Sequence, residues 1–333
     1  MPTGLELIRN EMRRQHADAL ASLDQARGVA KRVADSARAT GRLVLLGMGG
    51  SQYVNRIAEP IYRAQGIDAT ALVVSEVLRG RLPSRRRTVL LTSQSGGSGE
   101  ILRYVERPAG AEERFGMTLN GDSALGKALP CLVAAGGPER AFAATRSMTL
   151  TLALHGAILR ELGVDLAPLI AVLQNPVTPN VDAAVEPLVG CRAVVYSGRG
   201  VLQGVAEAAA LGLMELARMP AFAQEGGQFQ HGPLEMLGEG IGVALFRPAG
   251  ADAAGTARLV EVARAAGSPV VVYDVSGEGP VKDAVTITLP KSDGLAAAAT
   301  IFPAIQETMI GVASRRVTGV GEPVRSTKVS DGE

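Results

Sequence analysis

Hydrophobic and polar positions follow two different spacings along this chain, and the spacing changes near residue 42. Residues 4–40 place apolar residues at intervals of three or four among Arg, Ala and Glu, which predicts one or two amphipathic helices. From Arg42 onward, short runs rich in Val and Leu alternate with longer helical stretches, a pattern typical of parallel βαβ units. In the first half, this pattern predicts a long helix over about residues 145–162 and strands at residues 43–46, 70–74, 88–92, 115–119 and 131–134.

The second half repeats this alternation. The segment 174–181 contains two prolines and two asparagines between periodic stretches, which predicts a domain boundary. Beyond it, the pattern predicts helices over about residues 204–218 and 295–312, and strands at residues 193–197, 241–246, 270–274 and 285–289. We therefore expect an α/β fold of two tandem units, each a parallel sheet flanked by helices in three αβα layers, of the flavodoxin-like type.

One turn in the first half has the composition of a phosphate-binding site. The apolar run at residues 88–91 fits a buried strand, and it ends abruptly in Ser93-Gln-Ser-Gly-Gly-Ser98 before a helical pattern resumes at residue 101. The glycines let the backbone approach an anion, and the serine hydroxyls donate hydrogen bonds. Backbone N–H groups and the positive end of the helix dipole add to the field. An ordinary Ser/Gly loop is the alternative.

A second strand-to-turn junction changes the balance between these two interpretations. Gly47-Met-Gly-Gly-Ser51 again follows a strand and precedes a helical stretch. Its spacing begins a G-x-G-x-x-G dinucleotide fingerprint, but Gln52 stands where the third glycine belongs. Two neighbouring Ser/Gly turns on parallel strands therefore favour a compact phosphorylated ligand over NAD.

The composition of the chain indicates which classes of binding partner are unsuited to it. The 333-residue chain has a formal net charge of +1 and no basic tail, which argues against nucleic acid or an anionic membrane. We expect no apolar run that approaches the roughly 20 residues of a membrane span, and no signal peptide is evident, so we expect a cytoplasmic protein. The few histidines and cysteines are dispersed, so we expect no metal site, and we expect no cofactor. His155 lies in an apolar stretch and is expected to be a buried core histidine.

Three residues are candidates for proton or carbonyl chemistry. Glu215 lies near the end of an apolar helical run, where a carboxylate is costly unless it is paired or functional. His231 stands in Gln228-Phe-Gln-His-Gly-Pro, a bend between elements, and a loop histidine is a natural proton shuttle. The alternatives are an ordinary helix position and a surface turn. Lys328 alone would be a solvated residue of the tail.

Together these segments resemble the sugar isomerase (SIS) family. The resemblance is to the isomerase half of glucosamine-6-phosphate synthase and to stand-alone deaminase and phosphosugar isomerase relatives. Ser93-Gln-Ser-Gly resembles the family's phosphate loop, residues 46–51 its first sugar-contacting turn, and residues 137–146 the segment on the far side of the sugar. Ser197-Gly-Arg-Gly200 resembles the opening of a second SIS unit. The resemblance implies N-terminal helices at 1–34, SIS domains at 35–170 and 171–320, and a tail at 321–333.

The resemblance also implies a role for individual residues. Glu215 would move the proton between C1 and C2, His231 would assist ring opening, and Lys328 would lie beside the open-chain carbonyl or bond to it. The implied phosphate-binding residues are Ser51, Ser93, Gln94, Ser95 and Ser98. The implied sugar-binding residues are Met48, Gly49, Gly50, Phe142, Ala143 and Ala144.

We therefore expect an enzyme that isomerises or deaminates an amino-sugar phosphate, with glucosamine-6-phosphate to fructose-6-phosphate plus ammonia as the specific reaction. The chain does not begin with the N-terminal cysteine of a glutaminase domain, so we do not expect glutamine-dependent synthesis. A fructosamine-6-phosphate deglycase and a non-catalytic regulator that binds sugar phosphate remain alternatives. The resemblance further predicts a homodimer whose active site is shared, with His231 reaching the neighbouring subunit.

Overall fold

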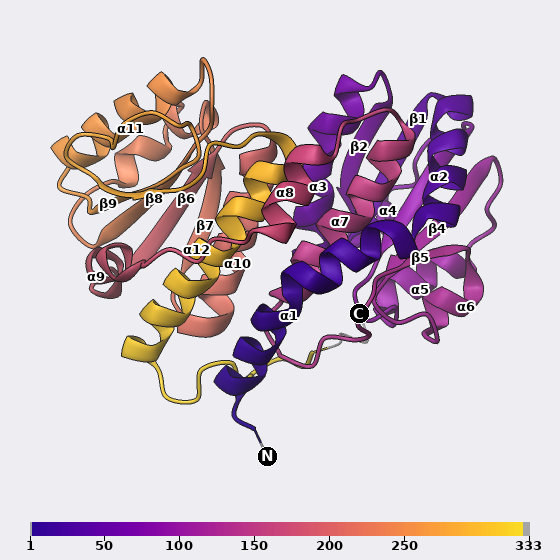
Figure 1. Cartoon of the computed structure of the whole chain (residues 1–333), viewed down its shortest axis with the longest axis horizontal. Helices are drawn as coiled ribbons and strands as arrows, with labels where there is room; N and C mark the ends of the chain where they lie inside the picture. The colour runs from indigo at the N-terminus through magenta and orange to yellow at the C-terminus, as the bar shows by residue number, and fades with distance from the viewer. Residues whose placement is uncertain (1, 329–333) are drawn as a thin grey trace. The chain divides into compact units, whose positions relative to one another are not determined.

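The computed structural model describes residues 2–328, and these residues form two compact units. The N-terminal unit comprises Leu7–Gln174 together with the tail residues 323–328, and the C-terminal unit comprises Asn175–Glu322 together with residues 2–6. In Figure 1 the main segment of the N-terminal unit runs from indigo to magenta, and the main segment of the C-terminal unit runs from rose through orange to yellow.

Five parallel strands form the sheet of the N-terminal unit, in the order β2-β1-β3-β4-β5. The strands are β1 (Arg42–Gly47), β2 (Asp68–Val73), β3 (Arg87–Thr92), β4 (Glu112–Thr118) and β5 (Cys131–Val133). The helices of this part of the chain are α1 (Gly4–Gln25), α2 (Arg27–Thr40), α3 (Gly49–Ala64), α4 (Val74–Arg79), α5 (Gly99–Glu106), α6 (Ala124–Ala128), α7 (Arg146–Glu161) and α8 (Ala167–Gln174). Because β1 pairs with β2 on one side and β3 on the other, a topological switch point lies between the carboxyl ends of β1 and β3.

Helix α2 illustrates how the sequence pattern becomes structure. Its buried residues Ala30, Val33, Ala34 and Ala37 repeat at helical spacing, so one stripe packs inward while the Arg and Lys residues stay outside. The helix ends where Gly41 adopts a φ of +66° and donates its N–H to the carbonyl of Ala37. Strand β3, in contrast, is buried at all six positions, as expected for a central strand of a parallel sheet covered on both faces.

The C-terminal unit has the same strand connectivity. Its parallel sheet has the order β10-β9-β8-β6-β7, so the first strand, β6, again lies between the second and the third. The strands are β6 (Ala193–Gly198), β7 (Ala221–Glu225), β8 (Ile241–Arg247), β9 (Val270–Asp274) and β10 (Val285–Thr288). The helices are α9 (Asp182–Val189), α10 (Val201–Ala217), α11 (Ala253–Ala265) and α12 (Gly294–Arg316), with short 3-10 turns η1 (Gln228–Gln230) and η2 (Pro233–Met236).

The predicted fold class is confirmed as an α/β protein with two parallel five-stranded sheets flanked by helices. Strand β7 was missed by the sequence analysis. It has only five residues, follows Pro220 directly, and lies at the sheet edge, where Ala221 alone is fully buried. A short edge strand without a clear apolar pattern carries little of the signal that identifies buried strands.

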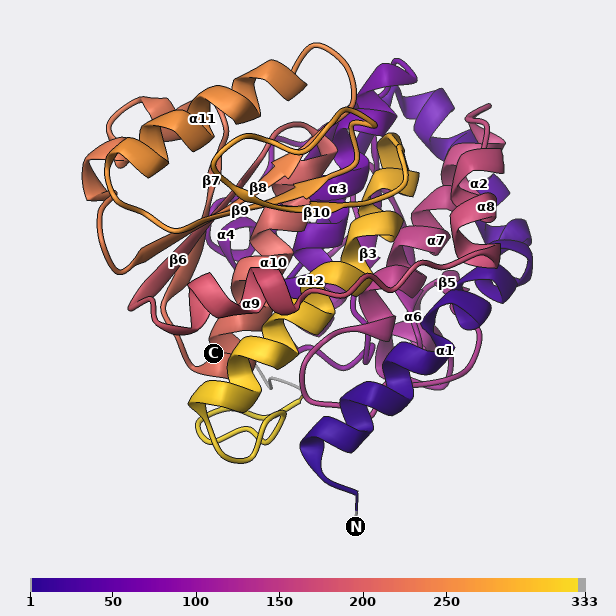
Figure 2. The same ribbon diagram turned by 60° about the vertical axis from the view of Figure 1, so that its left-hand side comes forward.

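Helix α12 corrects the expectation that no apolar run approaches a membrane span. Among the described residues it is the one helix long and apolar enough to cross a membrane by length and composition. However, 89% of its apolar window is buried within the structure. It runs alongside α10 (Figure 1, Figure 2) and also contacts α9, as the core helix of the C-terminal unit.

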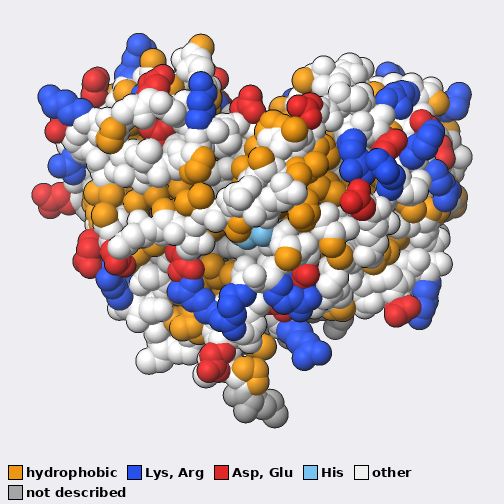
Figure 3. Space-filling model, viewed as in Figure 1, with side chains coloured by type: hydrophobic (Ala, Val, Ile, Leu, Met, Phe, Trp, Pro, Cys, Tyr) orange, Lys and Arg blue, Asp and Glu red, His pale blue; other side chains and the backbone are white. Residues whose placement is uncertain are grey.

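Charged side chains of both signs cover the two units. On the face shown in Figure 3, Lys and Arg side chains lie among Asp and Glu side chains over each unit. This mixing agrees with the formal net charge of +1 for the whole chain.

Candidate functional site

Two Ser/Gly turns lie next to each other in the N-terminal unit. Strands β1 and β3 are paired in parallel, with Gly47 opposite Thr92 at their carboxyl ends. The turn of residues 47–51 therefore emerges beside the turn of residues 93–98, at the switch point of the sheet. In open α/β sheets this is the place where ligands bind.

The turn of residues 93–98, which we call the phosphate turn, holds its hydroxyls close together. The Oγ atoms of Ser93 and Ser98 are 3.0 Å apart. The N–H of Gly96 donates to Ser93 Oγ and the N–H of Gly97 to Ser95 Oγ, each at 3.2 Å. Ser98 is the N-cap of α5 and makes no side-chain capping bond, so the first N–H groups of this helix point at the turn without a capping partner. Such groups attract an anion.

Gly96 is a position of this turn where no residue with a side chain fits. It has a φ of +65°, and a Cβ on it would lie 1.9 Å from Ser123 Oγ. The carbonyl of Gly96 accepts the N–H of Leu125, and the carbonyl of Gln94 accepts the N–H of Leu119, each at 3.0 Å. The turn is therefore braced from behind by the segment 118–125, which leaves its hydroxyl side for a ligand.

The turn at the carboxyl end of β1, which we call the first sugar turn, contains Met48, Gly49, Gly50 and Ser51. Gly49 has a φ of +50°, and Met48 is the N-cap of α3, so Ser51 lies in the first helical turn. A Cβ on Gly50 would lie 3.5 Å from the Cβ of Ala144, which shows that the turn and the segment 142–144 face each other. Of this segment, Phe142 and Ala144 are half-buried, whereas Ala143 is 1% exposed and turns into the core.

A buried polar chain supports the strand end beneath the phosphate turn. Thr92 Oγ1 donates to Asn55 Oδ1 at 3.0 Å, and the same oxygen lies 3.0 Å from His155 Nε2. Since this oxygen can only accept, His155 carries its proton on Nε2, and Nδ1 accepts from Tyr62 Oη at 3.1 Å. Burial lowers the pKa of His155 to about 3, so the imidazole is neutral. The expectation of a buried core histidine is confirmed.

Lys328 lies close to the predicted sugar segment. Its Nζ donates to Glu139 Oε2 at 3.0 Å and to the carbonyl of Phe142 at 3.2 Å. The structure thus brings the tail lysine and the segment 139–144 together within the N-terminal unit. Glu139 was not singled out by the sequence analysis, although it falls in the segment that the family resemblance covers.

Glu215 and His231 belong to the C-terminal unit. Glu215 is half-buried in the last turn of α10, where a carboxylate interacts unfavourably with the negative end of the helix dipole. His231 is exposed between η1 and η2. Phe229, which is 1% exposed, anchors this loop in the core, and Gly232 has a φ of +108° that other residues rarely adopt. The loop therefore presents His231 outward from a fixed base.

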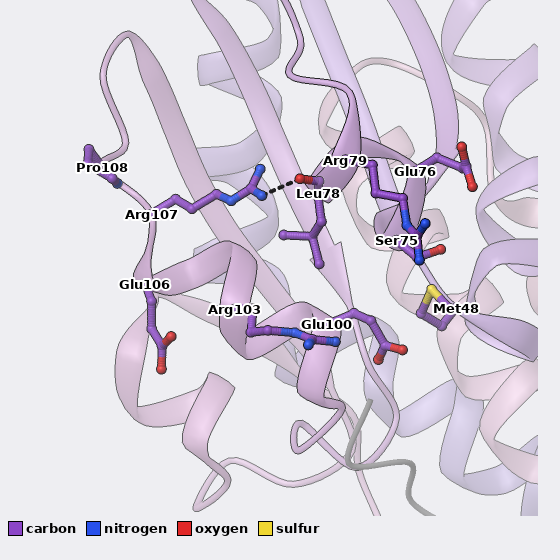
Figure 4. A pocket seen from close by; sticks show the side chains of 10 residues that line it. All are labelled: Met48, Ser75, Glu76, Leu78, Arg79, Glu100, Arg103, Glu106, Arg107 and Pro108. Atoms are coloured by element: carbon purple, nitrogen blue, oxygen red, sulfur yellow. Dashed lines mark hydrogen bonds between the residues drawn. The ribbon is translucent and has the colours of Figure 1, made fainter. Parts of the chain in front are cut away.

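An open pocket of about 830 Å³ lies beside Met48 of the first sugar turn and beside α5 in the N-terminal unit (Figure 4). Its lining comes from the first sugar turn, from α4, from α5 and from the two residues after α5. It comprises Met48, Ser75, Glu76, Leu78, Arg79, Glu100, Arg103, Glu106, Arg107 and Pro108. Arg107 is fixed by donating to the carbonyls of Val77 and Leu78. Arg103 extends toward Glu100 in Figure 4.

Glu100 is a residue that the sequence analysis missed. It lies two residues after the phosphate turn, in the first turn of α5, and it is only 8% exposed. A buried carboxylate that lines a pocket is an unfavourable arrangement unless a ligand or partner compensates it. The signal available in the sequence was an acidic residue in the first turn of the helix that follows a Ser/Gly turn. Among the described residues, no group of three or more His, Cys, Asp or Glu side chains is arranged to hold a metal ion.

Solved structures share this fold over nearly the whole chain. The C-terminal domain of glucosamine-fructose-6-phosphate aminotransferase from Francisella tularensis has a TM-score of 0.84 at 17% identity, covering 95% of this chain and 98% of that one. Glucosamine-6-phosphate deaminase from Thermotoga maritima has a TM-score of 0.71 at 19% identity, covering 94% of this chain and 99% of that one. At these identities the likeness establishes the fold.

Sequence comparison finds relatives over most of the chain and a family match over residues 187–306. The glutamine–fructose-6-phosphate aminotransferase (isomerizing) of Rhizobium meliloti is 25% identical over 283 residues, which cover 77% of this chain and 45% of that enzyme. The chain spans about half the length of the curated relatives it matches. The SIS domain family matches residues 187–306, which confirms the predicted resemblance. Residues 187–306 thus match the SIS domain family, and the chain is similar in sequence to the isomerizing glutamine–fructose-6-phosphate aminotransferases.

Proposed function

We propose that this protein is a phosphosugar isomerase that acts on an amino-sugar phosphate, with deamination of glucosamine-6-phosphate to fructose-6-phosphate and ammonia as its reaction. The observation that carries this proposal is the phosphate turn, where three serine hydroxyls and the start of α5 converge at the switch point of a parallel sheet. A dianionic phosphate is the ligand that such a turn suits. The similarity to relatives named for fructose-6-phosphate and glucosamine-6-phosphate supports the choice of sugar.

In the proposed reaction, Ser51, Ser93, Gln94, Ser95 and Ser98 hold the phosphate. His231 assists ring opening, and Glu215 takes the proton from C2 and returns it to C1. As the C2 proton moves to C1, the 2-amino group also loses one proton and the carbonyl oxygen O1 gains one, so the open-chain 2-amino aldehyde becomes a 2-imine with a hydroxyl on C1. Water then adds at C2 and ammonia leaves. A positioned carboxylate base contributes typically about 10²- to 10⁴-fold to such a transfer. Lys328 lies beside the carbonyl oxygen, where charge develops.

We also propose that both units are SIS domains, at residues 35–170 and 171–320, with 321–333 as a tail. The support is the common strand connectivity, in which the first strand of each sheet lies between the second and the third. Parallel five-stranded sheets with the same connectivity in tandem are expected from duplication of one unit.

A fructosamine-6-phosphate deglycase is the second candidate, and the pocket beside the first sugar turn and α5 favours it. Ammonia needs almost no space, whereas the pocket of about 830 Å³ offers Glu100 and Arg103 next to the phosphate turn. A leaving amino acid carries both an amine and a carboxylate, which this pair of opposite charges could bind. The two candidates share Glu215 and His231. They differ in the amine that leaves, in the carbon that carries it, which is C2 in glucosamine-6-phosphate and C1 in a fructosamine, and in the product, which is fructose-6-phosphate or glucose-6-phosphate.

The test is an assay of a panel of phosphorylated amino sugars and fructosamines for release of hexose phosphate, ammonia and amino acid. Glucosamine-6-phosphate should be turned over and free glucosamine should not. Glu215→Gln keeps the shape but removes the base, so turnover should fall by at least about 10² while ligand affinity changes little. Near-normal turnover in this variant would assign the base to another residue.

We propose that the active site is shared between the subunits of a homodimer. The support is the exposed position of His231 on a loop that is anchored only at its base. Mixing inactive Glu215→Gln and His231→Ala subunits should then restore up to about a quarter of wild-type activity, because random reassortment generates dimers with one intact site. Absence of recovery from a demonstrated mixed dimer would show that both residues act within one chain.

A further inference from the structure

The carboxylate of Glu139 is the most heavily bonded acidic group near the sugar segment. Oε1 accepts the N–H groups of Thr145 and Ser147, at 3.0 Å and 3.1 Å, and the hydroxyl of Thr145 at 3.3 Å. Oε2 accepts the hydroxyl of Ser147 at 2.6 Å and the ammonium of Lys328 at 3.0 Å. The side chain of Glu139 is 0% exposed. Both carboxylate oxygens of Glu139 thus accept hydrogen bonds, and Lys328 is the positively charged group among their donors.

These bonds tie the carboxylate to the start of α7. Thr145 is the N-cap residue of that helix, and Ser147 lies in its first turn. A negative group here satisfies helix N–H groups that would otherwise lack partners and lies at the positive end of the dipole. Burial raises the pKa of Glu139, but Lys328 and the hydrogen bonds from Ser147 and Thr145 outweigh it and hold the pKa below its ordinary value. Glu139 is therefore a fixed anion.

Two of the three N–H groups of the Lys328 ammonium donate hydrogen bonds that hold the side chain in place. One donates to Glu139 and one to the carbonyl of Phe142, which leaves the third for a ligand. Residues 322–327 are exposed, whereas Lys328 is half-buried, so the lysine is the most enclosed part of this described stretch of the tail.

We propose that Glu139 is a positioning residue: it docks the ammonium of Lys328, together with the Phe142 carbonyl, and so fixes the C-terminal tail against the sugar segment 142–144. Lys328 then acts as a docked cation whose remaining N–H faces the ligand. This inference rests on the proposed function only for the ligand, because the docking exists without substrate.

The experiment measures the rate at which acetic anhydride modifies each lysine in the substrate-free protein, read by mass spectrometry. Lys31 is the matched reference, since its ion pair with Asp35 at 2.5 Å is exposed on both sides. Lys328 should react at least roughly tenfold more slowly than Lys31, because a hydrogen bond to a buried charged group is worth more than an exposed ion pair. Glu139→Gln should abolish this protection, while Asp35→Asn should leave Lys328 unchanged. Equal modification rates of Lys328 in the wild type and in Glu139→Gln would overturn the proposal.

Glu139→Gln is a sharp change because glutamine preserves most of the other bonds. Its amide oxygen accepts from Thr145 and Ser147, and its NH₂ group donates to the Ser147 hydroxyl, so only the attraction for Lys328 is lost. If this variant does not fold, trypsin cleavage after Arg325 gives the same answer. Cleavage should be faster in Lys328→Met than in the wild type, and equal rates would contradict the docking.

Activity then separates positioning from a merely structural role. In a Lys328→Met background, Glu139→Gln should cause no further loss of turnover, because the carboxylate acts through the lysine. An additional loss in the double variant would show that Glu139 acts independently of Lys328. Slow modification of Lys328 without turnover of any phosphosugar would uphold the docking and reject the proposed function alone.

Discussion

The two units share one strand connectivity, but the switch point of the N-terminal unit is lined by uncharged residues and that of the C-terminal unit by charged residues. In the N-terminal unit, β1 and β3 end in uncharged turns of glycine and serine. In the C-terminal unit, β6 leads into Gly198-Arg199-Gly200, and β8 ends on Arg247. The guanidinium of Arg247 lies 3.0 Å from the carboxylate of Asp274 at the end of β9 and also binds Glu278.

This difference shows what the fold does and does not decide. The sheet fixes where loops from neighbouring strands converge, and so it fixes the location of a site. The side chains decide whether that location is open to a ligand. In the C-terminal unit, the charge of Arg247 is neutralised by two carboxylates of the same unit. In the N-terminal unit, the first N–H groups of α5 at the phosphate turn retain their attraction for an external anion.

The largest effect should come from removing the internal cation of the C-terminal unit. The side chains of Arg247 and Asp274 are 8% and 1% exposed, so Arg247→Met leaves a buried carboxylate without its counter-ion. The free energy of unfolding should fall by about 3–5 kcal/mol. Urea unfolding followed by circular dichroism measures this loss. The double variant Arg247→Met with Asp274→Leu should recover most of it, and a loss below about 1 kcal/mol in the single variant would show that the pair is not a structural unit.

The second effect should be confined to the N-terminal switch point. Ser95→Ala with Ser98→Ala removes two hydroxyls that would donate to the phosphate, each worth about 1.5–3 kcal/mol because the acceptor is charged. Affinity for glucosamine-6-phosphate, measured by calorimetry, should fall by at least about 10². The matched control is Ser197→Ala at the end of β6, which should leave this affinity unchanged. Equal affinity of the wild type for glucosamine and glucosamine-6-phosphate would reject the phosphate turn altogether.

The fold was predictable where a local pattern carries the information. The abrupt change from Val and Leu to Ser and Gly at Ser93 located both a strand end and a helix start, and the structure places β3 and α5 on either side of this turn. The turn of residues 47–51 was expected to precede a helix, but α3 begins within that turn, at Gly49, which has a φ of +50°.

The candidate site was less predictable because its support depends on contacts between distant residues. Arg146 is completely buried, and its guanidinium binds Glu11 and Asp18 of α1, which lie more than 100 residues away in the sequence. The role of Glu139 likewise depends on Lys328, which is 189 residues further along the chain. No periodicity links such residues, so the sequence indicated Lys328 only through a family resemblance.

The smallest effect is on how the free energy of unfolding depends on pH. It distinguishes a buried polar chain of the N-terminal unit from a buried hydroxyl pair of the C-terminal unit. Under the N-terminal turn the polar chain passes through His155, whereas the buried hydroxyl pair of the C-terminal unit, Tyr273 and Thr308, has no group that titrates below pH 7. Burial lowers the pKa of His155 from 6.5 to about 3. Between these values the unfolded chain binds a proton at this residue and the folded chain does not.

Falling pH therefore favours the unfolded state through His155, by about 1.4 kcal/mol for each pH unit below 6.5 until the folded pKa is reached. His155→Gln can still donate to Asn55 and accept from Tyr62, but it cannot take up a proton. Its free energy of unfolding should fall less steeply between pH 6 and pH 4 than that of the wild type, with the two slopes differing by about 1.4 kcal/mol per pH unit. The other titrating groups are common to both proteins and cancel in the difference. Parallel curves for the two proteins would mean that His155 is protonated in the folded state, and that the polar chain under the phosphate turn carries a charge.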